Sequence, residues 1–372
     1  MNSYANQLIP SGIRRFTALA KATPGCVSLT IGEPDLDTPQ NIREAAAAAI
    51  AAGRTHYAPN RGTDGLRKAI AEFETKRGLP CKTENVLVTV GATGALNTAL
   101  SCILNPGDEV IIPTPAFSLY ESITVAAGAK PVFLELDKSD FQIAPQALDA
   151  CISPKTRAIV INSPCNPTGV ALTRQSLDAV AKAAKEHGLF VLCDNVYMGL
   201  SEPGIPDLST DFDLGEKLLY CQSFSKPYAM TGWRIGYLIA NASLIDKFVL
   251  LQAAQIAAVP TFIQDSAVEA LQTDISNEQA VFRKRRAYVA GRLKEMGLSF
   301  PEPKGAFYLF PSIEAFGLDS ETFCTRMITE GGVAAVPGSA FRCEGRIRIS
   351  CCYSDAELEE GLNRLERFIR TL

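Results

Sequence analysis

Short apolar runs alternate with longer amphipathic segments through the middle of the chain. Short runs bounded by turn formers are typical of buried strands, whereas apolar positions at helical spacing are typical of amphipathic helices. The pattern predicts helices over residues 93–104, 119–126 and 176–187. It predicts strands over residues 86–90, 110–112, 132–136, 157–161, 189–193, 218–222 and 236–240. Such alternation indicates an α/β fold whose mainly parallel sheet is covered by helices on both faces.

The two ends of the chain have a different pattern. The segment before residue 46 is rich in loop formers, and the segment after Glu302 reads as strand, helix, strand and helix. A long helical pattern over residues 277–296 connects this C-terminal segment to the sheet region. We therefore expect a large domain over residues 46–282 and a smaller α+β domain built from residues 1–45 and 283–372.

The composition excludes several classes of partner. The 372 residues carry a formal net charge of -4, which offers no basic surface to a nucleic acid. Basic residues gather once, at 283–286, where the helical pattern favours a solvated face over a nucleic-acid patch. The most apolar segment, residues 248–263, is too short to span a bilayer, so no membrane association is expected.

The eleven cysteines have no regular spacing and no CxxC pair. Only two histidines, His56 and His187, could join them, so no metal site is expected. Free thiols in a reducing compartment are the simplest interpretation. Since the N-terminus also has no export signal, we expect a cytoplasmic protein.

Polar residues follow several predicted strands, and in open α/β sheets ligands bind at the carboxyl ends of the strands. Lys226 comes just after the strand at 218–222, where partial desolvation would make its amine a usable nucleophile. Ser223, Ser225 and Arg234 could form an oxyanion cradle beside it, because a guanidinium matches phosphate bidentately. A loop lysine taken alone would be an ordinary surface residue, but this frame favours a functional one.

Three more residues fit a pyridine-based cofactor. Asp194 ends the apolar run at 189–193, where its carboxylate could cap a helix or pair with a protonated pyridine nitrogen. Tyr197 could donate its phenol to a ring oxygen, or simply pack in the core. Asn166 lies in a turn-forming Asn-Pro-Thr-Gly segment, from which its amide could reach ring or substrate oxygens.

Two further segments indicate anion binding. Residues 91–96 join a strand to a helix with small side chains, which leaves backbone N–H groups at the helix N-terminus free for a phosphate. Thr93 is the expected N-cap of that helix. Arg346 and Arg348 share one face of a predicted strand, and either could bind a carboxylate, so their spacing does not choose between them.

Together these motifs resemble the class I and II aminotransferases of pyridoxal 5′-phosphate (PLP) fold type I, through nearly the whole chain. Their order and spacing make the resemblance specific. The motifs are Gly32-Glu33-Pro34-Asp35, Tyr57 to Gly62, Pro106 to Val110, Asn166-Pro167-Thr168-Gly169, Asp194 to Tyr197, Ser223 to Lys226 and Met230 to Tyr237. The visible departure is Asn195, which stands where the motif commonly has glutamate.

The resemblance implies a role for each matching residue. Lys226 would be the Schiff-base lysine and the base that moves the proton between Cα and C4′. Asp194 would pair with the pyridine nitrogen, while Tyr197 and Asn166 would contact the 3-oxygen. The cofactor phosphate would be held by Ala92, Thr93, Ser223 and Arg234.

The resemblance also implies the surroundings of the ring and of the substrate. Phe117 occupies the position of the aromatic residue that stacks on the pyridine ring. Arg348 would bind the substrate α-carboxylate, assisted by Asn166 and the Gly32 backbone. Tyr57 would reach the phosphate in the neighbouring subunit, which implies a homodimer with shared sites.

The implied activity is ping-pong transamination, in which an L-amino acid gives its amino group to the cofactor and a 2-oxo acid then receives it. The main alternative is a PLP-dependent β-eliminating carbon–sulfur lyase, which would need the same Lys226, Asp194 and Arg348. A non-catalytic PLP-binding regulator is disfavoured because residues 1–30 are too few for an appended DNA-binding domain. A nicotinamide oxidoreductase is disfavoured because no GxGxxG follows the first strand.

The amino donor stays open at this point. The resemblance is to the bacterial group that holds aspartate and N-acetyl-diaminopimelate aminotransferases, and aromatic or alanine donors remain alternatives. A dicarboxylate donor needs a second cation near its distal carboxylate, for which Arg14, Arg15 and Arg61 are available. Residues 9–14 resemble the segment that closes over the substrate.

Overall fold

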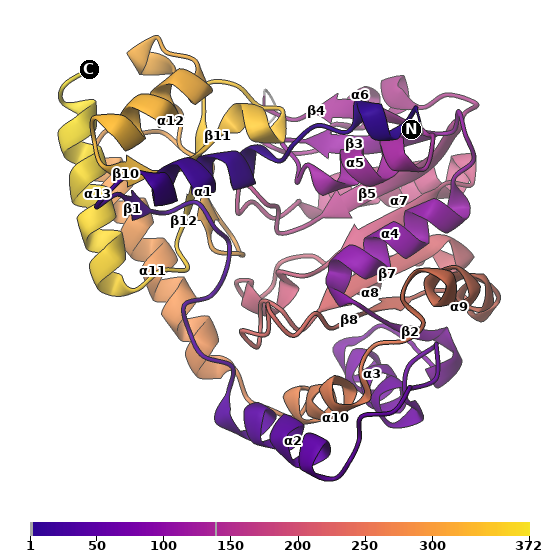
Figure 1. Cartoon of the computed structure of the whole chain (residues 1–372). Coiled ribbons are helices and arrows are strands. Elements are labelled where there is room, and N and C mark those ends of the chain that lie inside the picture. The colour runs from indigo at the N-terminus through magenta and orange to yellow at the C-terminus, as the bar shows by residue number, and fades with distance from the viewer. Residues whose placement is uncertain (1–2, 138–139) are drawn as a thin grey trace.

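The computed structural model describes residues 3–137 and 140–372, and its centre is a seven-stranded sheet (Figure 1). The strands lie in the order β2-β8-β7-β6-β5-β3-β4, in which β8 runs antiparallel to both of its neighbours. Their bounds are β2 Val86–Thr89, β3 Glu109–Thr114, β4 Lys130–Glu135, β5 Thr156–Asn162, β6 Phe190–Asp194, β7 Leu218–Ser223 and β8 Gly236–Ile239. Every strand predicted for the middle of the chain is present, which confirms the α/β class with a mainly parallel sheet.

Helices cover both faces of this sheet because its strands are apolar on both sides. Val86 and Leu87, neighbours on β2, belong to opposite hydrophobic cores, as the alternation of side chains along a strand requires. Helices α4, α5 and α9 cover one core, and α3, α6, α7 and α10 cover the other. The helices of this part are α2 Gln40–Ala51, α3 Asp64–Arg77, α4 Gly91–Ile103, α5 Leu119–Ala126, α6 Pro145–Cys151, α7 Arg174–His187, α8 Leu208–Asp211, α9 Ala242–Ile256 and α10 Thr261–Ala270.

The two ends of the chain meet in a second unit with its own core. Figure 1 shows α1, near the N-terminus, beside α12 and close to α13 at the other end of the chain. Strand β1 pairs in parallel with β10, and β11, β12 and β9 form an antiparallel sheet. The elements are α1 Gly12–Ala22, α11 Ser276–Glu295, α12 Ser320–Thr329, α13 Asp355–Ile369, β1 Val27–Ser28, β9 Tyr308–Leu309, β10 Val333–Ala334, β11 Val336–Pro337 and β12 Ile347–Ser350.

The expected domain boundaries remain a prediction. The boundary after residue 45 falls within α2, and the boundary after residue 282 falls within α11. Residues 1–2 and 138–139, which the predicted domains include, lie outside the described residues.

The description of the N-terminal 45 residues as loop-rich was wrong in part. Helix α1 forms because Ile13, Phe16 and Ala20 recur at helical spacing, and Phe16 and Ala20 are buried against the second unit. Helix α2 follows from an alanine-rich run with high helix propensity. Single 3-10 turns complete the chain: η1 Ala5–Gln7, η2 Thr83–Asn85, η3 Met198–Leu200, η4 Gly215–Lys217, η5 Glu314–Phe316 and η6 Gly338–Phe341.

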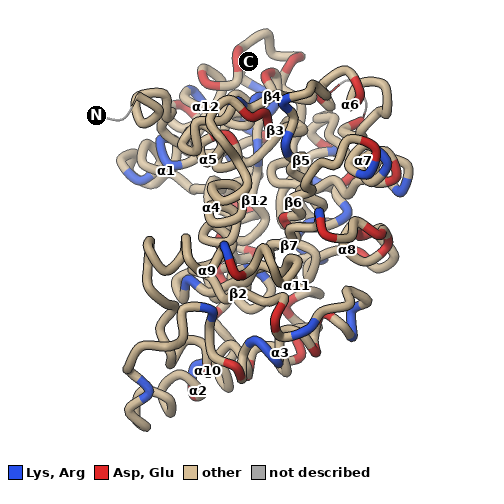
Figure 2. The backbone as a smooth tube through the Cα atoms, turned by 90° about the vertical axis from the view of Figure 1, so that its right-hand side faces the viewer, with Lys and Arg blue, Asp and Glu red and all other residues tan. Residues whose placement is uncertain are grey.

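The basic cluster at 283–286 is only in part the solvated face expected from the sequence, because Arg283 and Lys284 are exposed but the next two arginines are not. Arg285 is buried and pairs with Asp35 and Asp355, and the buried Arg286 pairs with Glu202. Both arginines therefore join α11 to other segments of the fold. Figure 2 shows basic and acidic stretches interspersed along the backbone. In the described ranges, no helix combines the length and the apolar character needed to cross a membrane.

Candidate active site

Three strand ends meet at one edge of the central sheet. Asn162 ends β5 and lies beside Asp194 at the end of β6, which in turn pairs with Cys221 near the end of β7. A cleft of ≈ 780 Å³ opens above them. All the predicted site residues except Tyr57 line this cleft, namely Gly32, Ala92, Thr93, Phe117, Asn166, Asp194, Tyr197, Ser223, Lys226, Arg234 and Arg348.

Lys226 lies just past the end of β7 with its amine in the cleft. Its Nζ donates to the Gly32 carbonyl oxygen at 2.7 Å. Burial lowers the pKa of this amine below its ordinary value, and the guanidinium groups of Arg348 and Arg234 lower it further, although Cys352 and Glu33 oppose them. A larger share of the amine is therefore neutral near neutral pH, and a neutral amine is what a nucleophile or a base requires.

Asp194 is a buried carboxylate at the end of β6. Its Oδ2 accepts a hydrogen bond of 2.6 Å from the Tyr120 hydroxyl, and its Oδ1 accepts one of 3.4 Å from the Val196 amide. Burial raises the pKa of the carboxyl to about 6, against these hydrogen bonds and the charge of Lys226, which lower it. No lysine or arginine in the described ranges forms an ion pair with Asp194, so its charge is only partly compensated.

Tyr120 was missed by the sequence analysis. It lies on α5 and contacts Phe117 edge to face, with 6.0 Å between the ring centroids. Burial and the neighbouring Asp194 raise the pKa of its hydroxyl well above the ordinary value, so the hydroxyl stays a donor. The available signal was weak: a tyrosine on the apolar face of a helix needs a partner for its hydroxyl, but the sequence does not say which.

Two tyrosines, Tyr197 and Tyr308, line the cleft on the side of the second unit. The Tyr197 and Tyr308 hydroxyls are 3.0 Å apart, and both side chains are buried. The Tyr308 hydroxyl also fills the space beside Gly32, where a Cβ would lie only 1.8 Å from it. Residue 32 must therefore be glycine for Tyr308 to reach Tyr197. Tyr308 was likewise missed, because it comes from a distant part of the sequence.

The opposite end of the cleft presents donors to an anion. Helix α4 begins at Gly91 with Val90 as its N-cap, and no side chain caps it, which leaves the N–H groups of its first turn available. The expected N-cap role of Thr93 is therefore wrong, because the helix starts earlier. The Arg234 guanidinium lies so close to Gly91 that a Cβ there would be 2.8 Å from its Nη2. The Ser223 hydroxyl lies beside it and donates to Ser225 Oγ at 2.8 Å.

Arg348 is the arginine that faces the cleft. It is 1% exposed, and its Nη1 donates to Asn166 Oδ1 at 2.8 Å while its Nη2 donates to the Thr30 carbonyl oxygen. Its Nε has no hydrogen-bond partner among the described residues. Arg346 instead donates to the Phe310 carbonyl oxygen at 3.2 Å and does not line the cleft. The fold thus places Arg348 in the cleft and Arg346 outside it, a distinction that their spacing in the sequence could not make.

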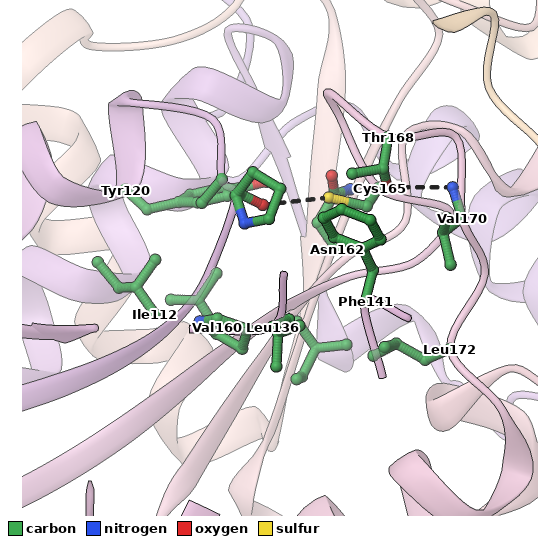
Figure 3. A pocket seen from close by; sticks show the side chains of 14 residues that line it. Ile112, Tyr120, Leu136, Phe141, Val160, Asn162, Cys165, Thr168, Val170 and Leu172 are labelled. Atoms are coloured by element: carbon green, nitrogen blue, oxygen red, sulfur yellow. Dashed lines mark hydrogen bonds between the residues drawn. The ribbon is translucent and has the colours of Figure 1, made fainter. Parts of the chain in front are cut away.

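Asn162 organises the floor of the cleft and was also missed. Its Nδ2 donates to the Asp194 carbonyl oxygen at 2.8 Å, and its Oδ1 accepts from the Asn166 amide at 2.9 Å. Asn162 and Tyr120 also line a second, mainly apolar cavity of ≈ 30 Å³ (Figure 3). Phe141 and Leu172 lie on another side of this cavity, which is too small and too apolar for an amino acid.

The donor set of the cleft fits PLP. A protonated pyridine nitrogen would compensate the buried charge of Asp194, and a phosphate would accept from the start of α4 and from Arg234. A substrate carboxylate would accept from the unbonded Nε of Arg348. In the described ranges, neither Arg234 nor Arg348 forms an ion pair with a carboxylate, so both cations are available to such anions.

Comparison with known proteins also identifies an aminotransferase. The family model described as "Aminotransferase class I and II" matches residues 24–365. The chain is 41% identical to aromatic-amino-acid aminotransferase 2 of Thermococcus litoralis, over 97% of this chain and 96% of that one. It is 40% identical to the aspartate aminotransferase of Pyrococcus abyssi, again over 97% and 96% of the two chains.

Solved structures agree with the sequence relatives. The aspartate aminotransferase of Thermotoga maritima superposes with a TM-score of 0.95 at 34% identity, over 100% of both chains. This likeness confirms fold type I. Nothing in these relatives favours the β-eliminating lyase. The chain belongs to the class I and II aminotransferases, and it is a PLP-dependent transaminase that acts on amino acids and 2-oxo acids.

Proposed function

We propose that Lys226, Asp194 and Tyr197 are the catalytic residues of this transaminase. The observation that carries the proposal is the Lys226 amine, which lies in the cleft with a lowered pKa. When bound, PLP withdraws electrons from the substrate and so makes the proton on Cα acidic. Lys226 would hold the cofactor through its amine, and the same amine, when neutral, would be the base that moves the proton between Cα of the substrate and C4′.

The remaining cleft residues would orient the cofactor. Asp194 would keep the ring nitrogen protonated, since the buried carboxylate is stabilised by a cation beside it. Tyr197 and Asn166 would donate to the ring 3-oxygen, and Phe117 would stack on the ring. Four residues at the start of α4, at the end of β7 and just before β8 would hold the phosphate, namely Ala92, Thr93, Ser223 and Arg234.

Arg348 would bind the substrate α-carboxylate. Its guanidinium is already fixed by Asn166 and Thr30, so little side-chain entropy is lost on binding. The Gly32 backbone would close the other side of the substrate, because Gly32 lies between Lys226 and Tyr308.

We also propose a cytoplasmic homodimer with shared sites. Tyr57 is 93% exposed and lies outside the cleft of its own chain, as expected of a residue that completes the site of a second copy. Leu250 and Ile256 on α9 are exposed apolar side chains that a partner would cover. The eleven free cysteines support the cytoplasm as the compartment, and the two-domain division at residues 45 and 282 remains part of the proposal.

An acidic amino acid is the donor that we propose. Of the three arginines considered from the sequence, Arg15 pairs with Glu321 and Arg61 pairs with Asp246. Arg14 on α1 lines the cleft, and no carboxylate in the described ranges pairs with it. It therefore supports a donor with a distal carboxylate, such as aspartate.

Purified enzyme reconstituted with PLP tests the catalytic proposal. We expect borohydride reduction to attach PLP permanently to the protein, and we expect amino transfer from aspartate to 2-oxoglutarate. Lys226→Ala should lose both, whereas Lys217→Ala, at the opposite end of β7, should keep both. A Lys226→Ala enzyme that transaminates at the wild-type rate would sink the proposal. Pyruvate released from cysteine without any 2-oxo acid would point to the lyase instead.

A further inference from the structure

A closed ring of buried and partly buried hydrogen bonds joins α3 to the ends of β6 and β7. We call it the buried ring, and it consists of Glu74, Arg77, Asp207, Asn195, Gln222 and Tyr220. Arg77 Nε donates to Glu74 at 2.9 Å and its Nη2 to Asp207 at 3.2 Å. Tyr220 closes the ring by donating to Glu74 at 3.0 Å. None of its members lines the active-site cleft.

The other half of the buried ring runs along the ends of β6 and β7. Asn195 Nδ2 donates to both oxygens of Asp207, at 3.0 and 3.1 Å. Gln222 Nε2 donates to the Asn195 carbonyl oxygen at 2.9 Å and to the Tyr220 hydroxyl at 3.3 Å. Gln222 Oε1 accepts from the Ser223 amide at 2.8 Å. The Gln222 side chain thus fixes both Asn195, which follows Asp194, and Ser223, which is the first residue of the proposed phosphate cradle.

Asn195 is fixed by its backbone and by its side-chain nitrogen. Its amide donates to the Cys221 carbonyl oxygen at 3.0 Å, its carbonyl accepts from Gln222, and its side chain donates to Asp207. The amide form of residue 195 matters here, because a carboxylate would place a second negative charge against Asp207. The ring holds two carboxylates and one guanidinium, and Glu74 is fully buried.

We infer that Gln222 and the other members of the buried ring are positioning residues for the cofactor. They fix the ends of β6 and β7 relative to each other, so that Asp194 and Ser223 can bind the same PLP molecule. This inference rests on the proposed roles of those two residues. Breaking the ring should loosen PLP and change the environment of its ring nitrogen without removing any group that touches it.

A pair of glutamine substitutions separates positioning from general stability. Gln222→Met removes the bonds to Asn195 and Ser223. Gln264→Met is the matched control, because Gln264 is also buried and also bonds two backbone groups, the Val259 carbonyl and the Thr63 amide, but is not part of the buried ring. Both variants should unfold at lower temperature as apoenzymes, since each leaves buried backbone groups unsatisfied.

Only Gln222→Met should raise the Kd for PLP, by about 10-fold, and shift the pH midpoint of the bound-PLP absorbance. Equal PLP affinity and equal spectra in Gln222→Met and the wild type would overturn the inference, as would the same loss in both variants. If the wild type itself binds no PLP, the proposed function fails instead. Should Gln222→Met not fold, Tyr220→Phe removes the hydroxyl that bonds Glu74 and Gln222 while keeping the packed aromatic side chain, and we expect a smaller rise in Kd, about threefold.

Discussion

The Tyr120 hydroxyl donates to the Asp194 carboxylate over 2.6 Å, and the two side chains are 2% and 4% exposed. Burial nevertheless raises the pKa of Asp194 to about 6, so this hydrogen bond and the longer one from the Val196 amide do not offset the loss of water around the charge. The folded apoenzyme therefore binds this proton more tightly than the unfolded chain does. The carboxyl contributes stability below pH about 4, and this contribution is lost as the pH rises through about 6.

The first prediction concerns this pH dependence in the apoenzyme. The unfolding free energy of the wild type should fall relative to that of Asp194→Asn by roughly 3 kcal/mol between pH about 4 and about 7. Urea denaturation of the two apoenzymes at several pH values measures the difference. With PLP bound the difference should shrink, because a ring cation would lower the pKa again. Parallel pH profiles of the two apoenzymes would contradict the prediction.

A methyl group at residue 32 should damage the cleft. In Gly32→Ala the new Cβ would meet the Tyr308 hydroxyl, whose displacement breaks its contact with Tyr197. We expect KM for the amino donor to rise about 10-fold, the cost of one lost buried hydrogen bond. Gly291→Ala is the control, since no atom lies within 4 Å of its Cβ position on α11. An unchanged KM in Gly32→Ala would show that Tyr308 has room to move.

Arg348 on β12 and Arg346, the residue just before this strand, provide a matched comparison. Arg348→Lys loses the planar fork that we propose for the α-carboxylate, and steady-state kinetics should show kcat/KM falling about 100-fold for every amino donor. Arg346→Lys changes the residue just before β12, which does not line the cleft, and its kcat/KM should stay within about twofold. Equal losses of kcat/KM in both variants would contradict the proposed role of Arg348 in binding the α-carboxylate.

Arg14 and Arg15 are neighbours with different surroundings. Because Arg14 lines the cleft, Arg14→Gln should lower kcat/KM for aspartate about 10-fold and leave alanine within about twofold. Arg15→Gln only removes the surface ion pair with Glu321 and should change neither donor. A panel of amino donors with 2-oxoglutarate measures both variants. Loss of alanine activity in parallel with aspartate activity would contradict an acidic-donor role.

The strand ends could be predicted because each is marked by an apolar run of residues that are neighbours in the sequence. The apolar runs that end at Asp194 and before Ser223 identify buried strands by themselves, and parallel strands bring their carboxyl ends to one edge. The order and spacing of the motifs then identified the cofactor and the reaction. The fold could thus be derived from short-range patterns, and the cleft residues followed from it.

What the sequence did not reveal depends on contacts between distant segments. Tyr120 and Tyr308 look like core residues in the sequence, and their hydroxyl partners come from β6 and the loop after it. Arg346 and Arg348 share the same spacing and differ only in what packs around them. Arg285 looks like part of a charged helix face, because its carboxylate partners Asp35 and Asp355 are far away in the sequence.

The pairing of β1 with β10 has a consequence for biosynthesis. Val27 cannot find its partner Val333 until almost the whole chain has left the ribosome, which takes roughly 15–60 s at ordinary rates of synthesis. During that interval the apolar face of α1, including Phe16, has no core to cover it. We therefore expect the segment around α1 to stay open to chaperones until the last strands emerge, and substitutions there should reduce yield in cells more than they reduce the stability of the finished enzyme.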